Sequence, residues 1–251
     1  MTASGEFKDH FSGQAAAYAA HRPTYPRALV DFLADMSPQQ TVALDCGCGT
    51  GQLSTLLADR FAAVVATDAS AAQIANATPH PKVIYKTAPA ERSGLPDASV
   101  DLVTVAQAAH WLDLDAFYAE VRRIAVPRAV AALITYGVLH LDSDAEAVVQ
   151  HFYHDAIGSY WPPERSHVED GYRRLAFPFA EIAAPAMAIE VSWRLADVVG
   201  YVSTWSAVAA ARKTLGDAPL ETFQTALVKV WGDPNAPKTV RWPLSLRVAR
   251  I

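Results

Sequence analysis

The sequence is poor in cysteine, since only Cys46 and Cys48 occur among its 251 residues. A single residue separates them, which is too tight a spacing for an ordinary disulfide, and no other cysteine is present to pair with either. A zinc site would need further cysteine or histidine ligands at suitable spacing nearby, and the sequence has none there. We therefore expect two small residues of a turn, no metal site and a reduced, cytoplasmic setting.

The sequence also lacks an excess of basic charge and any long apolar run. Its formal net charge is −5 at pH 7, and it has no basic stripe of the kind that binds nucleic acid. The longest apolar stretch, about residues 129–141, is too short to span a bilayer. The first ten residues lack the basic and apolar regions of a secretory signal. We expect a cytoplasmic monomer or homodimer whose partner is a small molecule, not nucleic acid or a membrane.

Apolar residues are abundant and follow a regular order. They make up 51% of the chain, against 19% charged residues, and such a chain can bury a sizeable core. From residue 41 to residue 136, short apolar runs alternate with segments of helical spacing. Continuously apolar strands separated by helices are typical of a parallel sheet covered on both faces. The expected strands are 41–45, 63–67, 82–87, 100–106 and 129–136, with helices at 52–61, 70–77 and 114–125.

The rest of the chain carries a different pattern. Segments 186–194 and 238–249 are rich in Val, Ile, Leu or Trp, and we expect them to complete the sheet as an antiparallel pair. Segments 148–157, 198–212 and 220–230 have helical character and would form a cap. The sequence thus predicts an α/β fold: a doubly wound, seven-stranded, mostly parallel sheet with an antiparallel C-terminal strand pair and a helical cap.

These patterns divide the chain into four parts. Residues 1–40 would form an N-terminal helical lid segment, with a break at 21–26 between two helix-prone stretches. Residues 41–139 would form the ligand-binding core, and 140–236 the helical cap insertions with one sheet strand. Residues 237–251 would supply the final sheet strand.

The strongest motif is the glycine-rich turn DCGCGTG at residues 45–51. It follows a predicted strand and opens a helix, the place where open parallel sheets bind ligands. A nicotinamide or flavin site would require a glycine at position 52, which is Gln52 here, and needs no acid just before the glycines. Asp45 stands there, and its negative charge repels a pyrophosphate but suits an ammonium group. S-adenosylmethionine carries an ammonium and a sulfonium group and no phosphate, so the charge of Asp45 favours it over a dinucleotide.

A second acidic residue, Asp68, ends the next predicted strand. It lies about 20 residues beyond the glycines, the offset at which a carboxylate grips ribose hydroxyls. The alternative is that Asp68 only caps the following helix. The glycine turn before it favours the ribose role.

These residues resemble a known family. DCGCGTG at 45–51 together with Asp68 is similar to the cofactor motif of class I S-adenosylmethionine-dependent methyltransferases, with their Rossmann-like fold. The segments APAE at 88–91 and LPDASVDLV at 95–103 resemble the third and fourth strand region of that family. QAAHW at 107–111 and RPTYP at 22–26 resemble the methyltransferase type 11, trans-aconitate methyltransferase-like subgroup. The resemblance covers about residues 10–136.

The resemblance implies a role for each matching position. Asp45, Gly47 and Gly49 would hold the methionine end of the cofactor. Asp68 would bind the ribose, with Ala69 beside the adenine. The remaining cofactor contacts would come from Ala90 and Glu91 at the adenine edge and from Gln107 at the methionine portion.

Two residues after the fourth predicted strand are candidates for the reaction itself. His110 could act as a base or orient the acceptor, or it could be a loop histidine bonded to backbone. A base is needed for a hydroxyl or amine acceptor but not for a carboxylate, which is already ionised at pH 7. Trp111 could wall the substrate pocket or anchor the next helix in the core.

Other candidates flank the core. Tyr18 and Arg22 are four residues apart and would share a helix face, where Arg22 could pair with a carboxylate of cofactor or substrate. Tyr25 could lie over the sulfonium at the acceptor side, or the whole segment could be an ordinary surface turn. Trp161 is a candidate for the acceptor pocket, although aromatic residues are more often simply core.

Three functions follow as hypotheses. The first is S-adenosylmethionine-dependent methyl transfer to a small molecule, at an oxygen of a carboxylate or hydroxyl. The second is a nicotinamide-dependent oxidoreductase, against which Asp45 and Gln52 argue. The third is a catalytically silent module that binds S-adenosylmethionine, which fold analogy alone does not separate from the first.

Overall fold

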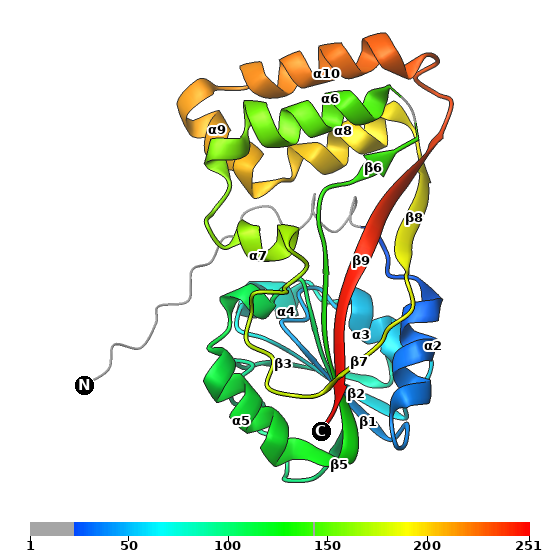
Figure 1. The fold of residues 1–251 in the computed structure, drawn as a ribbon, viewed down its shortest axis with the longest axis vertical. Coiled ribbons are helices and arrows are strands. Elements are labelled where there is room, and N and C mark those ends of the chain that lie inside the picture. Colours follow the sequence, from blue (N-terminus) through cyan, green and yellow to red (C-terminus); the bar gives the residue numbers. More distant parts are fainter. Residues whose placement is uncertain (1–22, 143) are drawn as a thin grey trace, which may run out of the picture.

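The computed structural model describes residues 23–142 and 144–251, and within them a nine-stranded sheet runs through the molecule (Figure 1). The strand order is β3-β2-β1-β4-β5-β9-β6, and β7 and β8 also pair with β9. The strands are β1 (Val42–Cys46), β2 (Ala63–Asp68), β3 (Val83–Thr87), β4 (Val100–Ala106), β5 (Ala125–Tyr136), β6 (His140–Leu141), β7 (Glu181–Ile182), β8 (Ala188–Trp193) and β9 (Lys238–Arg250).

The first five strands are parallel to one another, as the alternation of apolar runs and helical segments predicts. Side chains of β1, β2 and β4 are buried along nearly their whole length. A strand buried on both faces must be covered by helices on both sides. Because the strands run in the same direction, the carboxyl ends of β1, β2, β4 and β5 meet at one edge of the sheet, where the predicted ligand residues lie.

Helices cover the two faces separately. On one face, α2 (Arg27–Met36) and α3 (Gln52–Leu57) share a core with Ala43, Leu102 and Val130. The other face has α5 (Leu114–Ile124), whose Asp113 caps its first turn, together with the segment around α7 (Arg165–Glu169). Between β2 and β3, α4 (Ala71–Ala75) is capped by Ser70, as predicted. This arrangement is the doubly wound sheet that the sequence predicts.

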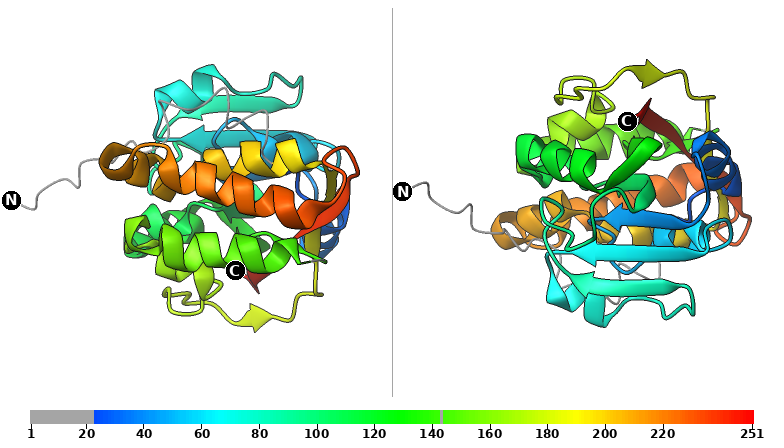
Figure 2. Two further views of the ribbon diagram at one scale, coloured as in Figure 1. Left: turned by 90° about the horizontal axis from the view of Figure 1, so that it is seen from above. Right: turned by 90° about the horizontal axis from the view of Figure 1, so that it is seen from below.

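A helical cap lies beyond the carboxyl edge of the sheet (Figures 1 and 2). Its principal helices are α6 (Ala145–His151), α8 (Leu195–Ser203), α9 (Ser206–Leu215) and α10 (Ala218–Trp231). Two short turns accompany them, the π-helical η3 (Phe152–Ala156) after α6 and the 3₁₀ turn η4 (Gly158–Tyr160). A further 3₁₀ turn, η2 (Ala109–Trp111), lies in the sheet half after β4. The long strand β9 joins both halves, because its end pairs with β5 and β7 and its beginning with β6 and β8.

The fold class is as predicted, with differences in detail. The described part of the chain has nine strands where seven were expected, because the two-residue strands β6 and β7 carry no usable sequence pattern. The helix expected at 198–212 is two helices, α8 and α9, separated at Thr204 and Trp205. Both cysteines are free and buried. No helix within residues 23–142 and 144–251 is long and apolar enough to cross a membrane.

Candidate active site

The turn after β1 brings the backbone close to the turn after β4. Gly47, Gly49 and Gly51 all have positive φ angles, of 63°, 56° and 90°, a conformation that glycine adopts at little steric cost. A Cβ atom added at Gly47 would lie 2.6 Å from the Cβ atom of Ala108. The glycine at position 47 is therefore required both by its φ and by this contact.

Asp45 lies at the end of β1 with its carboxylate buried. The hydroxyl of Ser54 donates to one carboxylate oxygen (2.6 Å) and that of Thr104 to the other (2.8 Å). Burial raises the pKa of the Asp45 carboxyl to about 6, against the lowering effect of these two hydrogen bonds. Among the described residues Asp45 has no cationic partner, and a buried carboxylate without one attracts a cationic ligand.

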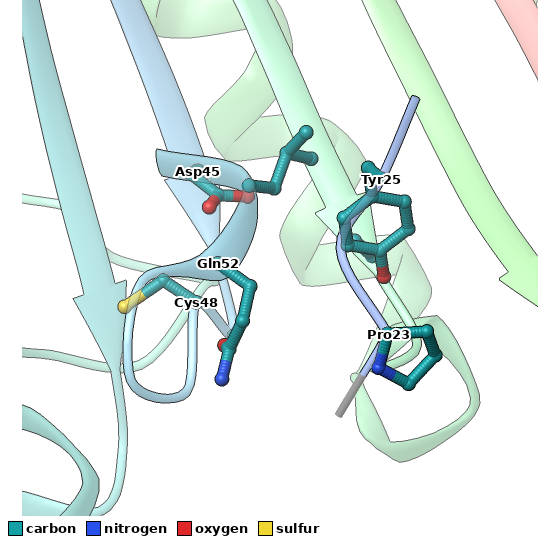
Figure 3. Close-up of a pocket in the computed structure, with 8 residues that line it drawn as sticks. Pro23, Tyr25, Asp45, Cys48 and Gln52 are labelled. Carbon is teal, nitrogen blue, oxygen red and sulfur yellow. The ribbon is translucent and has the colours of Figure 1, made fainter. Parts of the chain in front are cut away.

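A small, open pocket adjoins Asp45 (Figure 3). In the figure, Pro23 and Tyr25 lie on one side. Opposite them are Asp45 at the end of β1, Cys48 in the following loop and Gln52 at the start of α3. The pocket is lined by Pro23, Tyr25, Asp45, Gly47, Cys48, Gln52, Leu53 and Ala106. Two of the predicted cofactor residues and one predicted acceptor residue thus share one cavity.

Asp68 ends β2, next to the glycine turn. Its carboxylate accepts hydrogen bonds from the backbone N–H of Gly49 (2.9 Å) and of Ser70 (2.8 Å). Asp68 therefore holds the glycine turn and lies just before α4, whose cap is the hydroxyl of Ser70, and the ribose role of Asp68 stays a prediction. Ala69, beside it, is exposed at the sheet edge.

The loop after β3 lies beside the end of β2, because the N–H of Ala88 donates to the carbonyl of Asp68 (3.0 Å). In this loop Ala90 is buried, and the carboxylate of Glu91 accepts the N–H of Asp113 (2.9 Å). The loop that carries Ala90 and Glu91 thus starts beside Asp68, and their contact with the adenine stays a prediction.

Gln107 follows β4 in a left-handed conformation (φ 58°), which is uncommon for a residue other than glycine. Its amide group donates to the carbonyl of Tyr136 (2.8 Å) and accepts the hydroxyl of Thr135 (2.9 Å). The side chain of Gln107 is therefore bonded to the carboxyl end of β5. Strained backbone of this kind concentrates at functional sites.

His110 lies in η2, and its Nδ1 is 2.8 Å from the buried hydroxyl of Tyr172. The pKa of His110 is lowered to about 3, mainly by burial and to a smaller extent by the nearby Arg165 and His167. The imidazole is therefore neutral at pH 7. Tyr172 itself has a positive φ of 64°, directly after Gly171.

Two predicted tryptophans lie in different halves of the molecule. Trp111 is half-buried and packs on the ring of His110, with centroids 4.7 Å apart. Trp161 lies in the cap, where its Nε1 donates to the carbonyl of Tyr153 and its ring contacts Trp205. The guanidinium of Arg165 lies 4.8 Å from the centroid of Trp161.

Of the three N-terminal candidates, only Tyr25 lies within the described residues. Tyr18 and Arg22 lie outside the described residues. Tyr25 is buried and meets Tyr136, at the end of β5, edge to face with centroids 6.2 Å apart.

Comparison with known proteins gives a consistent answer. Residues 44–133 match the family described as "Methyltransferase domain". A Dictyostelium discoideum protein named "Putative methyltransferase" is 33% identical over 230 residues, which cover 90% of this chain and 88% of that protein. The solved structure of "a Putative Type II Methyltransferase" from Anaeromyxobacter dehalogenans has 50% identity and a TM-score of 0.88, over 91% of this chain and 97% of that one. The YcgJ protein of Bacillus subtilis, at 15% identity and a TM-score of 0.53 over 90% of this chain and 98% of its own, shares the fold alone.

The chain belongs to the S-adenosylmethionine-dependent methyltransferases. It is an enzyme of class I, and S-adenosylmethionine is its cofactor. The nicotinamide alternative is thereby excluded.

The described residues of this methyltransferase fit that cofactor. A buried carboxylate that has only hydroxyl partners suits an ammonium group, and the close glycine turn gives a ligand access to backbone.

The structure also brings together residues of the methyltransferase that sequence reasoning missed. Tyr172, Thr135 and Arg165 come from segments far apart in the sequence, so no local motif could mark them.

Proposed function

We propose that this methyltransferase transfers a methyl group to an oxygen atom of a small acceptor, a carboxylate or a hydroxyl. The observation that carries the proposal is the neutral His110, whose Nδ1 is taken by Tyr172. A histidine with so low a pKa is a poor general base but a suitable hydrogen-bonding partner through Nε2. A carboxylate acceptor is ionised at pH 7 and needs no base, so this arrangement supports the carboxylate more strongly.

The cofactor supplies an activated methyl group, so the protein contributes alignment and the exclusion of water. We assign Asp45 to the ammonium group, Gly47 and Gly49 to backbone contacts at the methionine end, and Asp68 to the ribose hydroxyls. Ala69, Ala90 and Glu91 would border the adenine. Gln107, whose amide is bonded to Thr135 and Tyr136, would hold the loop after β4 next to the methionine portion.

The acceptor would lie between the sheet edge and the cap. His110 and Trp111 would border it from the loop after β4, Tyr25 from the N-terminal segment and Trp161 from the cap. In this assignment the part of the predicted lid segment 1–40 that borders the site is the stretch before α2, around Tyr25, and residues 140–236 select the acceptor. The trans-aconitate methyltransferase-like subgroup and a cytoplasmic location are part of the same proposal.

The test is transfer of tritiated methyl from S-adenosylmethionine to a panel of small carboxylic acids, alcohols and amines. Carboxyl methyl esters release volatile methanol in mild alkali, whereas methyl ethers and N-methyl products do not. We expect alkali-labile product with at least one acid. Transfer only to alkali-stable product formed on nitrogen or carbon would refute the oxygen acceptor.

A separate binding experiment with Asp68→Ala tests the cofactor assignment. Loss of paired ribose hydrogen bonds should weaken S-adenosylhomocysteine binding at least tenfold, since each bond to a charged group contributes about 1.5–3 kcal/mol. The control, Asp59→Ala, removes an exposed carboxylate that pairs with Arg27 on the surface. Unchanged affinity in Asp68→Ala by calorimetry would show that the ribose assignment is wrong. Binding without turnover on any acceptor would instead support the silent-module alternative.

A further inference from the structure

Arg165 opens α7, the short helix that lies between the sheet and the cap (Figure 1). This helix packs against η2, which carries His110, and against β5. The helix that carries Arg165 therefore lies beside the turn after β4, in the region where the acceptor is proposed to bind.

The guanidinium group of Arg165 is held by aromatic side chains. Its Nε donates to the hydroxyl of Tyr153 (2.6 Å), and its Cζ lies 4.8 Å from the centroid of Trp161 and 5.4 Å from that of Tyr153. Packing on aromatic faces stabilises a cation without neutralising it. The side chain is therefore ordered before any ligand arrives, which reduces the entropy lost on binding.

The charge of Arg165 has no direct anionic partner in the part of the chain that the structure describes. Neither Nη atom has a hydrogen-bond acceptor there, and no carboxylate lies within ion-pair distance. Glu169 is linked to Arg165 only through the hydroxyl of Tyr153, which donates to it (2.9 Å). Asp170 is occupied by Arg174. A half-buried arginine with its two Nη groups unused is suited to bidentate binding of a planar or tetrahedral anion.

The positive charge extends toward the turn after β4. Arg165 and His167 both disfavour the charged form of His110, and Arg165 also acts on the hydroxyl of Tyr172. Arg165 is therefore close enough to His110 for its positive charge to act on the imidazole.

We propose that the Nη groups of Arg165 bind an anionic group of the methyl acceptor, a carboxylate or a phosphate, and so select acceptors that carry one. This inference rests on the proposed function, because it assigns the acceptor side of that site. Trp161 and Tyr153 are positioning residues for the guanidinium.

Binding of simple anions tests the proposal without turnover. The probes are succinate, inorganic phosphate and the neutral succinamide, titrated by calorimetry into the full-length enzyme saturated with S-adenosylhomocysteine. We expect succinate or phosphate, but not succinamide, to bind the wild type. Arg165→Gln should weaken that binding at least tenfold, and Arg165→Lys, which keeps the charge but loses the bidentate fork, should weaken it less. Arg173→Gln is the matched control, because Arg173 is an exposed arginine of the same segment bonded only to a backbone carbonyl.

The outcomes separate this inference from the proposed function. Equal anion affinity in Arg165→Gln and wild type, or no anion binding by the wild type, would overturn the role of Arg165. With an accepted substrate from the tritium panel, Arg165→Gln should raise KM at least tenfold and leave kcat within about threefold. Methyl transfer with an unchanged KM in Arg165→Gln would leave the methyltransferase assignment intact and refute the anion site. Arg165-dependent anion binding without transfer to oxygen would support the site and refute the proposed acceptor atom.

Discussion

At the scale of single residues, the buried carboxylate of Asp45 sets a pH dependence. Burial raises its pKa from 3.8 to about 6. The proton is therefore taken up as the pH falls through 6, which removes the charge that would hold a cationic ligand. The stability of the unliganded protein changes in the opposite direction. Its free energy of unfolding rises as the pH falls through 6, because protonation removes the cost of a buried charge.

We predict that S-adenosylhomocysteine binds about tenfold more weakly at pH 5 than at pH 7, because the carboxylate of the unliganded site takes up one proton over that range. Calorimetry across pH 5–8 measures this. Asp45→Asn should bind weakly throughout, with little pH dependence between 5 and 7. A wild-type affinity that stays constant to pH 5 would contradict the role of Asp45.

His110 should behave in the opposite way, because its pKa is lowered to about 3 by burial first and by Arg165 and His167 second. We predict that its imidazole stays neutral from pH 8 to pH 5, as read from nitrogen chemical shifts in NMR spectra. His110→Gln assigns the signal among the eight histidines of the chain. Titration of that signal near pH 6.5 would show that the histidine is exposed and able to act as a base.

At the scale of elements, Asp101 joins the start of β1 to β4. Its buried carboxylate accepts the backbone N–H groups of Thr41 and Val42, both at 3.0 Å. Asp101→Ala leaves two donors without their acceptor and should lower the free energy of unfolding by about 1–3 kcal/mol. Asp101→Asn keeps an acceptor oxygen and should lose less. Chemical denaturation measures both, and equal stability of the alanine variant and the wild type would rule out this role.

Elements with a strong local signal could be predicted from the sequence. The apolar runs of β1, β2 and β4 are visible because both faces of each strand are buried. The glycine turn was predictable because its φ angles exclude most other residues. The break between α8 and α9 was not, because the aromatic packing of Trp205 against the cap depends on residues distant in sequence.

In the candidate site too, residues with a local sequence signal could be predicted and those placed by tertiary contacts could not. Asp45 and Asp68 could be found from their position after predicted strands, since strand ends of a parallel sheet meet at one edge. Tyr172 could not, because it reaches His110 over 62 residues from a left-handed turn after Gly171. A Cβ atom at Gly171 would meet the side chain of Ser245 in β9 at 2.6 Å, a tertiary contact without a local pattern.

At the scale of the whole molecule, β9 and its aromatic neighbours connect the sheet to the cap. Trp242 in β9 is fully buried and packs against Tyr136 of β5, Trp193 of β8 and Tyr201 of α8, with centroids 5.2–6.5 Å away. Tyr136 continues the contact to Tyr25 at the pocket. Because one strand and one aromatic cluster serve both halves, the cap and the sheet should unfold together.

Trp242→Ala tests that coupling. Removing a buried tryptophan should cost about 3–5 kcal/mol of stability, a large share of the roughly 5–15 kcal/mol of an ordinary domain. Trp242→Phe should cost less, because it retains a ring and the indole N–H has no partner among the described residues. Hydrogen exchange measured under mild denaturant follows the β4 and α10 amides separately. Both sets should lose protection by the same amount in Trp242→Ala, because the lost packing belongs to one cooperative unit. Loss confined to α10 would mean that the cap unfolds independently and that β9 does not couple acceptor selection to the cofactor site.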